Sequence, residues 1–103
     1  QPVVAKLREL TERFEQMNAR VEEPDKVQPG YKEFHARRLV ETAGHIIIPY
    51  LLARQAGEEA EYVRSAQIYC KLAEARIAEA YTYLMHSEPS DTELFRQVEQ
   101  EYL

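Results

Sequence analysis

The sequence has little glycine and almost no cysteine, the residue that forms disulfides and binds soft metals. Its 103 residues include 3 glycines and 1 cysteine, and no tryptophan. With one cysteine no disulfide can form within the chain, so we expect a reducing compartment and a buried, unreactive Cys70. The scarcity of glycine favours a helical chain, and 45% hydrophobic residues are enough for the core of one domain.

Excess basic charge and long hydrophobic runs are also missing. The chain has 13 basic and 18 acidic residues, and its net charge of −5 would repel a phosphate backbone, so nucleic acid is not an expected partner. No apolar run reaches the roughly 20 residues that a membrane-spanning helix needs. The first residues do not form a basic segment followed by a hydrophobic one. We therefore predict a cytoplasmic protein without a membrane partner.

Helical periodicity dominates what is present. Apolar residues near the start recur at spacings of four and three, which predicts a helix along Val3, Leu7, Leu10, Phe14, Met17 and Val21. This pattern is already running at Val3 and no initiator Met precedes it, so we interpret residues 1–103 as one domain cut from a longer chain. The next run, EEPDKVQPG, holds two prolines and a glycine and predicts a loop over residues 22–30 that interrupts the helix.

Two long helices are expected after this loop. The first is predicted from about Tyr31 to Gln55 and is closed by Gly57, and the second from about Glu58 to His86. In the second, a heptad row of larger residues faces a row of alanines: Val63, Cys70, Ile77 and Leu84 against Ala66, Ala73 and Ala80. Large residues beside small ones let helices approach closely, so the two should form an antiparallel hairpin.

A short helix is predicted at the end of the chain. In the run SDTE, Ser90 and Glu93 have the spacing of a capping box, which precedes the apolar residues Leu94, Phe95, Val98 and Tyr102. The fold class that follows is all-α: an antiparallel helical bundle of three long helices plus a short C-terminal helix.

Pro49 interrupts the most apolar stretch, HIIIPYLL over residues 45–52. A proline inside a helix removes the hydrogen bond to the carbonyl four residues earlier, here His45, at a cost of about 3 kcal/mol. Burial of each large apolar neighbour returns roughly 1.5 to 3 kcal/mol. We therefore expect the helix to continue through Pro49 with a bend, which Gly44 would ease.

The apolar neighbours of Pro49 point in almost every direction around the helix axis: Ile46, Ile47, Ile48, Tyr50, Leu51 and Leu52. An outer helix of a small bundle needs only one apolar stripe. Either the other helices cover the remaining face, or it contacts a surface outside this chain, such as a second copy or a parent domain. We treat these six residues as interface candidates.

Polar residues near this stretch suggest little chemistry. Glu41 and His45 are four residues apart and could form a hydrogen bond or half of a metal site, although a core or interface histidine is the favoured interpretation. A carboxylate site in a helical bundle needs Glu-x-x-His on two helices, and that motif does not occur. His35 and His86 are interpreted as surface residues.

Two further groups of side chains allow a binding interpretation beside a plain one. Arg37 and Arg38 could bind a phosphate-bearing ligand such as a coenzyme A tail, but an ion pair of Arg37 with Glu33 is favoured. A row on the last long helix could be the edge of the core or the rim of a partner-binding surface: Tyr62, Tyr69 and Tyr83. No phosphate-binding glycine loop, activated nucleophile or zinc motif is present, so we predict no catalytic residue, cofactor site or metal site in this chain.

Two segments carry a resemblance to a known family. The stretches FHARRLVETAGHIIIPYLLARQA, Phe34 to Ala56, and YVRSAQIYCKLAEARIAEAYTYL, Tyr62 to Leu84, cover about half of the chain. They resemble the extra C-terminal helical domain of some bacterial acyl-CoA dehydrogenases. The resemblance rests on residue order and helical layout, because no catalytic motif lies within these segments.

The resemblance implies a flavoprotein of fatty acid metabolism, whose dehydrogenase body oxidises acyl-CoA thioesters with FAD. Neither the catalytic base nor the FAD contacts of such a body can be assigned to residues of this chain. The implied role is noncatalytic: packing against the parent body or a second subunit, with a homo-oligomer as one such arrangement. The alternative is a free-standing helical module that binds a partner protein and has no connection with flavin chemistry. A small helical metalloenzyme that uses Glu41 and His45 is a third and weaker interpretation.

Overall fold

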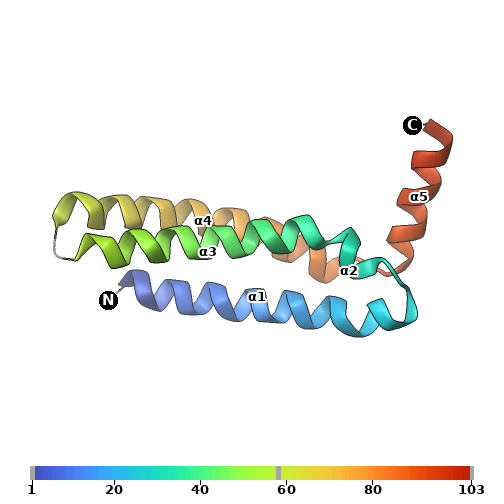
Figure 1. The fold of residues 1–103 in the computed structure, drawn as a ribbon, viewed down its shortest axis with the longest axis horizontal. Helices are drawn as coiled ribbons and strands as arrows, with labels where there is room; N and C mark the ends of the chain where they lie inside the picture. The colour runs from blue at the N-terminus through green and yellow to red at the C-terminus, as the bar shows by residue number, and fades with distance from the viewer. Residues whose placement is uncertain (1, 58, 103) are drawn as a thin grey trace.

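The computed structural model describes residues 2–57 and 59–102, and almost all of them lie in α-helices. The helices are α1 (Pro2–Val27), α2 (Tyr31–Phe34), α3 (Ala36–Ala56), α4 (Ala60–His86) and α5 (Ser90–Tyr102) (Figure 1). Within the described ranges no strand occurs, so the predicted all-α class is confirmed.

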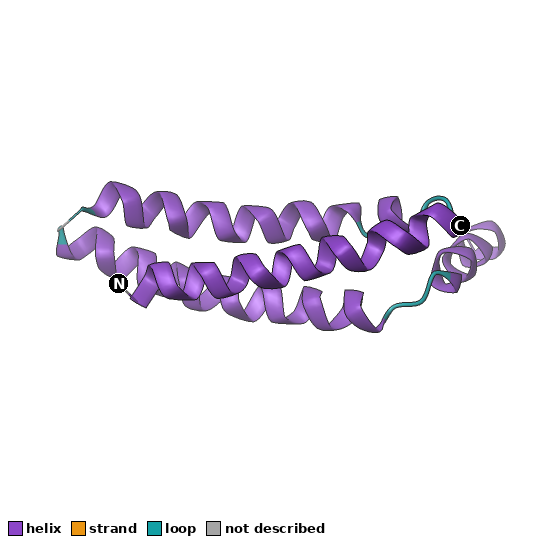
Figure 2. Cartoon of the chain, turned by 90° about the horizontal axis from the view of Figure 1, so that it is seen from below, coloured by secondary structure: helices purple, strands orange, loops and turns teal. Residues whose placement is uncertain are grey.

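Three long helices form the body of the molecule. α3 and α4 lie side by side as the predicted antiparallel hairpin, and α1 packs against both of them (Figures 1 and 2). The principal extents are 54 × 28 × 17 Å, so the bundle is elongated. Gly57 follows α3 with a positive φ of +52°, a conformation that favours glycine. The predicted start of the second long helix, Glu58, lies outside the described residues, and α4 begins at Ala60.

The core follows the periodicity of the sequence. One buried cluster joins the first half of α1 to the middle of α4: Val3, Leu7, Leu10, Cys70, Ala73 and Ile77. A second joins the other half of α1 to the end of α4, to α2 and to the start of α3: Met17, Val21, Tyr31, Leu39 and Leu84. Cys70 is buried as predicted, and burial raises the pKa of its thiol, so the reactive thiolate is disfavoured.

The predicted loop over residues 22–30 is wrong for most of its length, because α1 continues through Pro24 to Val27. A proline there deprives only the Arg20 carbonyl of its helical hydrogen bond. The last turn remains bonded, since the Gln28 amide donates to the Pro24 carbonyl over 2.7 Å. The chain leaves the helix at residues 28–30, where Pro29 restricts Gln28 and Gly30 takes a φ of +99°.

The single helix predicted from Tyr31 to Gln55 is divided at His35, which lies between α2 and α3 with φ −98° and ψ 3°. The amide of His35 bonds to the Lys32 carbonyl over 3.1 Å, which closes α2 as a tight turn. Burial of the imidazole places the break here, because His35 is fully buried and its ring contacts groups from other elements. The prediction that His35 lies on the surface is therefore wrong, whereas His86 is exposed as predicted.

α3 passes through Pro49 without interruption, as expected. The proline ring is one of the fully buried groups of the molecule. It lies in a row spaced by four and three that faces α1 and α4 and includes Leu39, Thr42 and Ile46. Packing of the ring in this row offsets part of the lost hydrogen bond.

α5 differs from the prediction in its cap and extends away from the bundle (Figures 1 and 2). Instead of a box formed by Ser90 and Glu93, the Asp91 carboxylate accepts a hydrogen bond from the Glu88 amide over 2.9 Å, and Glu93 pairs with Arg96. The capping contact lies two residues earlier than predicted because the amides of Asp91 and Thr92 already bond to carbonyls of the preceding turn, over 2.9 and 3.2 Å. Thr92 is buried, so the base of α5 is anchored while its remainder is exposed.

Candidate functional site

The outward side of α3 exposes several large apolar side chains around Pro49. Ile47 is 53% exposed and Leu51 45% exposed, and Ile48 and Tyr50 are exposed to a similar degree. Ile46 and Leu52 are half-buried at the edges of this face. The structure thus divides the six candidates into four exposed residues and two that border the core.

The neighbouring helices leave this face open. Towards the start of α3 it continues through Gly44 to Val40, which is 71% exposed. A side-chain carbon added at Gly44 would meet no atom within 4 Å, so the described part of the chain does not cover the middle of the face. Of the two alternatives for these residues, coverage by the chain's own helices does not apply to the described structure.

A groove runs beside this face, where α3 meets the first half of α1. Its floor and walls include Leu7, Ile46 and Tyr50, and it encloses about 550 Å³. Val4 on α1 is exposed next to it and adds apolar surface. Arg8, Glu12 and Glu15 border the groove on the α1 side. An apolar floor with a charged border is typical of a surface that contacts another protein segment.

The tyrosine row on α4 is only partly a surface. Tyr62 and Tyr83 are exposed, whereas Tyr69 is half-buried against the core. The guanidinium of Arg38 lies 4.1 Å from the centre of the Tyr83 ring, within the range of a cation–π contact. The same guanidinium lies 5.9 Å from the Phe34 ring. The charge of Arg38 therefore contacts aromatic rings of this chain.

Ser87 makes several buried polar contacts, and it was not among the residues singled out from the sequence. Its hydroxyl donates to the Leu84 carbonyl over 2.7 Å and lies 2.5 Å from the Tyr31 hydroxyl and 2.9 Å from His35 Nε2. Its carbonyl accepts a hydrogen bond from Arg20 over 2.7 Å. One residue at the end of α4 thus links α1, α2 and the break before α3. The sequence did contain a sign that His35, one of the partners of Ser87, is buried. His35 lies four residues before Leu39 and extends the buried row of α3 towards the N-terminus.

These contacts determine the protonation state of His35. The Ser87 hydroxyl uses its one hydrogen to donate a hydrogen bond to the Leu84 carbonyl. Nε2 of His35 must therefore carry a proton and donate a hydrogen bond to Ser87 Oγ. Nδ1 is then an acceptor without a partner, and it is buried. Burial, together with the positive charge of Arg38, lowers the pKa of His35 from 6.5 to about 4. His35 and Ser87 are both buried, so the pair is a structural contact that a substrate in solution does not reach.

The other polar candidates do not form a site. Glu41 pairs with Arg37 over 2.9 Å and not with His45, so the predicted ion pair of Arg37 with Glu33 is wrong. Arg37 prefers Glu41 because the two lie one turn apart on α3, whereas Glu33 lies beyond the break at His35. No group of three or more potential metal ligands comes together in residues 2–57 and 59–102.

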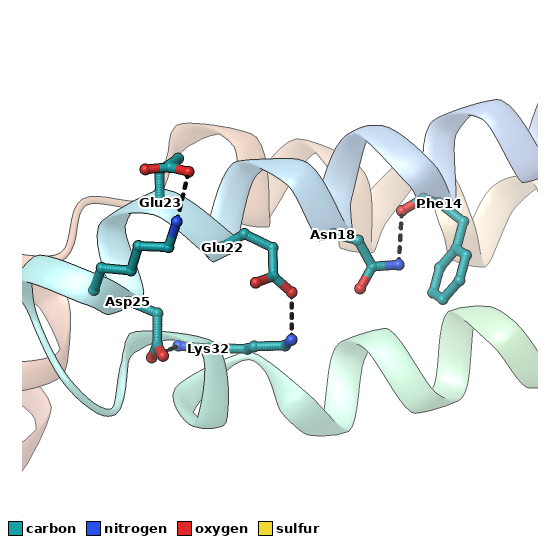
Figure 3. Close-up of polar contacts among 7 residues, drawn as sticks. Phe14, Asn18, Glu22, Glu23, Asp25 and Lys32 are labelled. Carbon is teal, nitrogen blue, oxygen red and sulfur yellow. Dashed lines mark hydrogen bonds and ion pairs between the residues drawn. The ribbon is translucent and has the colours of Figure 1, made fainter.

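A polar cluster closes the end of the bundle around Lys32. The Lys32 ammonium pairs with Glu22, and its backbone amide donates to the Asp25 carboxylate over 2.9 Å (Figure 3). In the same region the Asn18 side chain donates to the Phe14 carbonyl over 3.3 Å. The two contacts of Lys32 hold the last turns of α1 against α2 and involve solvent-exposed charges. They explain the extension of α1 better than they suggest a ligand site.

α5 carries a second exposed apolar surface. The sequence pattern predicted a short helix here, and in the structure its stripe of Leu94, Val98 and Tyr102 is exposed. Phe95 lies against the body of the molecule, where its ring centre is 5.7 Å from that of Phe34. The sequence pattern identified an amphipathic helix correctly but could not show that its apolar side lacks a partner within the chain.

None of the described helices is long and apolar enough to cross a bilayer. In a comparison with protein families, the chain matches the family described as "Acyl-CoA dehydrogenase C terminal" over residues 1–92. Comparison with curated proteins gave no match. Comparison with solved structures gave none either.

Proposed function

Because this chain belongs to the acyl-CoA dehydrogenase C-terminal family, we propose that it is a noncatalytic helical domain of an FAD-dependent acyl-CoA dehydrogenase. The other part of that protein would bind FAD and oxidise the thioester. This domain would contact the dehydrogenase body or a second subunit and stabilise the assembly.

The exposed face of α3 is the observation that carries the proposed role. Ile47, Ile48 and Leu51 project from a helix whose opposite side is already packed against α1 and α4. Exposed aliphatic side chains grouped on one face are unfavourable in water, and a surface that covers them gains stability in proportion to the apolar area removed from water. A packing role explains why this helix is apolar on both sides.

The noncatalytic part of the proposal is supported by how the polar groups are used. Ser87 and His35 are buried in contacts within the chain, and Arg38 stacks on Tyr83 and Phe34. Burial also raises the pKa of the Cys70 thiol, so this residue is a poor nucleophile. These groups contribute to the stability of the domain.

A charge placed on the face tests the proposed role in the protein that carries this domain. Ile47→Asp would put a carboxylate into the contact, and we expect the assembly to dissociate at least ten-fold more readily in analytical ultracentrifugation. Acyl-CoA oxidation per bound FAD should remain close to that of the parent protein.

Ile68→Asp is the matched control, since Ile68 is 70% exposed on α4 and lies outside this face. It should leave the assembly unchanged. Equal behaviour of the two variants would contradict a packing role for the α3 face.

A further inference from the structure

α3 and α5 each carry an uncovered apolar face. On α3, Val40, Gly44, Ile47 and Leu51 follow one another at spacings of four, three and four, the same row geometry that packs helices together in the core. On α5, Leu94, Val98 and Tyr102 follow at spacings of four. We propose that α5 of one copy of this chain packs along the α3 face of a second copy, and that the two copies exchange these contacts reciprocally. This inference rests on the packing role proposed for the α3 face.

The dimensions of the two stripes agree. At about 1.5 Å per residue, Val40 to Leu51 extends over roughly 16 Å and Leu94 to Tyr102 over roughly 12 Å. The α5 stripe therefore fits within the length of the α3 stripe. Gly44 in the middle of that stripe leaves open space, so a large side chain from a second helix, such as Tyr102 or Leu94, could approach the backbone closely.

The charges of the two helices are complementary. α3 carries the arginines Arg37, Arg38 and Arg54 against Glu41, a net charge of +2. α5 carries four acidic residues, Asp91, Glu93, Glu99 and Glu101, against Arg96, a net charge of −3. Glu99 and Glu101 are exposed on either side of the Val98 position, and Arg37 and Arg54 are exposed towards the two ends of the α3 stripe. Opposite charge around an apolar centre favours pairing of α5 with α3 over pairing of α5 with α5.

The base of α5 prevents the same contact within one chain. Thr92 is buried, the Asp91 carboxylate caps the Glu88 amide, and Phe95 lies against Phe34. These contacts hold α5 pointing away from the bundle (Figure 1). Folding α5 back onto its own α3 would break all of them, whereas a second copy can meet α5 where it already stands. A two-fold axis then makes both contacts equivalent.

Cysteine cross-linking in the full-length protein tests the partner directly. One preparation carries Ile47→Cys and the other Val98→Cys, and the two are mixed under mild oxidation. We expect an intermolecular disulfide at several-fold higher yield than in a mixture of Ile47→Cys with Gln100→Cys, because Gln100 lies on the opposite side of α5. The unmodified protein controls for Cys70, which is buried. Equal yields in the two mixtures would overturn the inference, as would a cross-link that forms only within one chain when both cysteines are placed together.

A second measurement separates this inference from the proposed function. In the full-length protein, Ile47→Cys should react with a maleimide about ten-fold more slowly than Ile68→Cys, and adding Val98→Asp should restore fast reaction. Slow reaction that persists with Val98→Asp means that another surface covers α3: the packing role stands and the α5 inference fails. Fast reaction of Ile47→Cys without Val98→Asp contradicts both.

Discussion

At the scale of single residues, His35 shows how a buried polar group organises several elements. It has no exposed surface, donates from Nε2 to Ser87 and leaves Nδ1 without a partner. A neutral imidazole fits this arrangement, whereas a protonated one would place a buried charge next to Arg38 and Arg20. The identity of residue 35 therefore links the stability of the fold to pH.

The folded-state pKa of His35, about 4, lies below the ordinary value of 6.5 for a free histidine. Its contribution to stability is complete above the ordinary value and decreases as the pH falls towards the lowered one. Between about pH 7.5 and about pH 5 we expect His35 to reduce the free energy of unfolding by roughly 2 kcal/mol. Urea denaturation at both pH values would measure this difference.

The variant His35→Gln should lose that part of the pH dependence, whatever its own stability. His86→Gln is the control, since His86 is exposed, and its pH dependence should match that of the parent chain. An unchanged slope in His35→Gln would show that the imidazole is not held neutral by its surroundings.

At the scale of helices, two glycines of the same chain have opposite roles. Gly44 lies inside α3 with open space around it, so within one copy of the chain its missing side chain lowers helix propensity without relieving a clash. Gly30 has a φ of +99° between α1 and α2, a conformation that alanine adopts at a cost.

We therefore expect Gly44→Ala to raise the free energy of unfolding of the monomer by about 0.5 to 1 kcal/mol. Gly30→Ala should lower it by about 1 kcal/mol or more. Thermal and urea unfolding of both variants would measure the two changes. Destabilisation by Gly44→Ala would mean that the space beside Gly44 is occupied within the monomer.

The helices themselves were largely predictable, and their ends were not. The rows on α1 and α4 identify both helices because their buried residues are apolar and evenly spaced. Pro24 was expected to end α1, but the contacts of Lys32 with Glu22 and Asp25 support the last turns, and such contacts between distant residues leave no local pattern. The break at His35 was missed for the same reason, since it depends on Ser87, 52 positions away along the chain.

The candidate surface was predictable in part. The excess of apolar residues around Pro49 indicated an uncovered face, and the structure locates it on Ile47, Ile48, Tyr50 and Leu51. Composition could not show that Ile46 and Leu52 border the core, because their burial depends on the position of the neighbouring helices. Nor could the sequence show that α5 projects from the bundle, since an amphipathic pattern does not identify its partner.

At the scale of the whole molecule, the structure divides into a packed bundle and a projecting helix. α4 lies in the core along its length, with Ala73 and Ile77 fully buried, whereas α5 from Glu93 onwards is exposed. Segments with few buried contacts open at low free energy, and core segments open only on global unfolding.

Hydrogen exchange of the monomeric chain should therefore show two classes of amide. Those of residues 94–102 should exchange at least a hundred-fold faster than those near Ala73 and Ile77, as measured by mass spectrometry of peptic peptides. Equal protection of the two regions in the monomer would contradict an unsupported α5. Protection of α5 that rises with protein concentration would agree with the dimer contact.

The two ends of the bundle are joined in different ways. At one end Ser87 binds three other parts of the chain through directional contacts, and at the other α1 meets α4 mainly through aliphatic side chains and the exposed Lys6–Glu74 pair. Burial of aliphatic surface is non-directional, whereas a set of converging hydrogen bonds is lost when its geometry shifts. The contacts of Ser87 therefore fix the geometry of one end of the bundle, and we expect thermal separation of α1 from the α3–α4 hairpin to begin at the other end, near Val3.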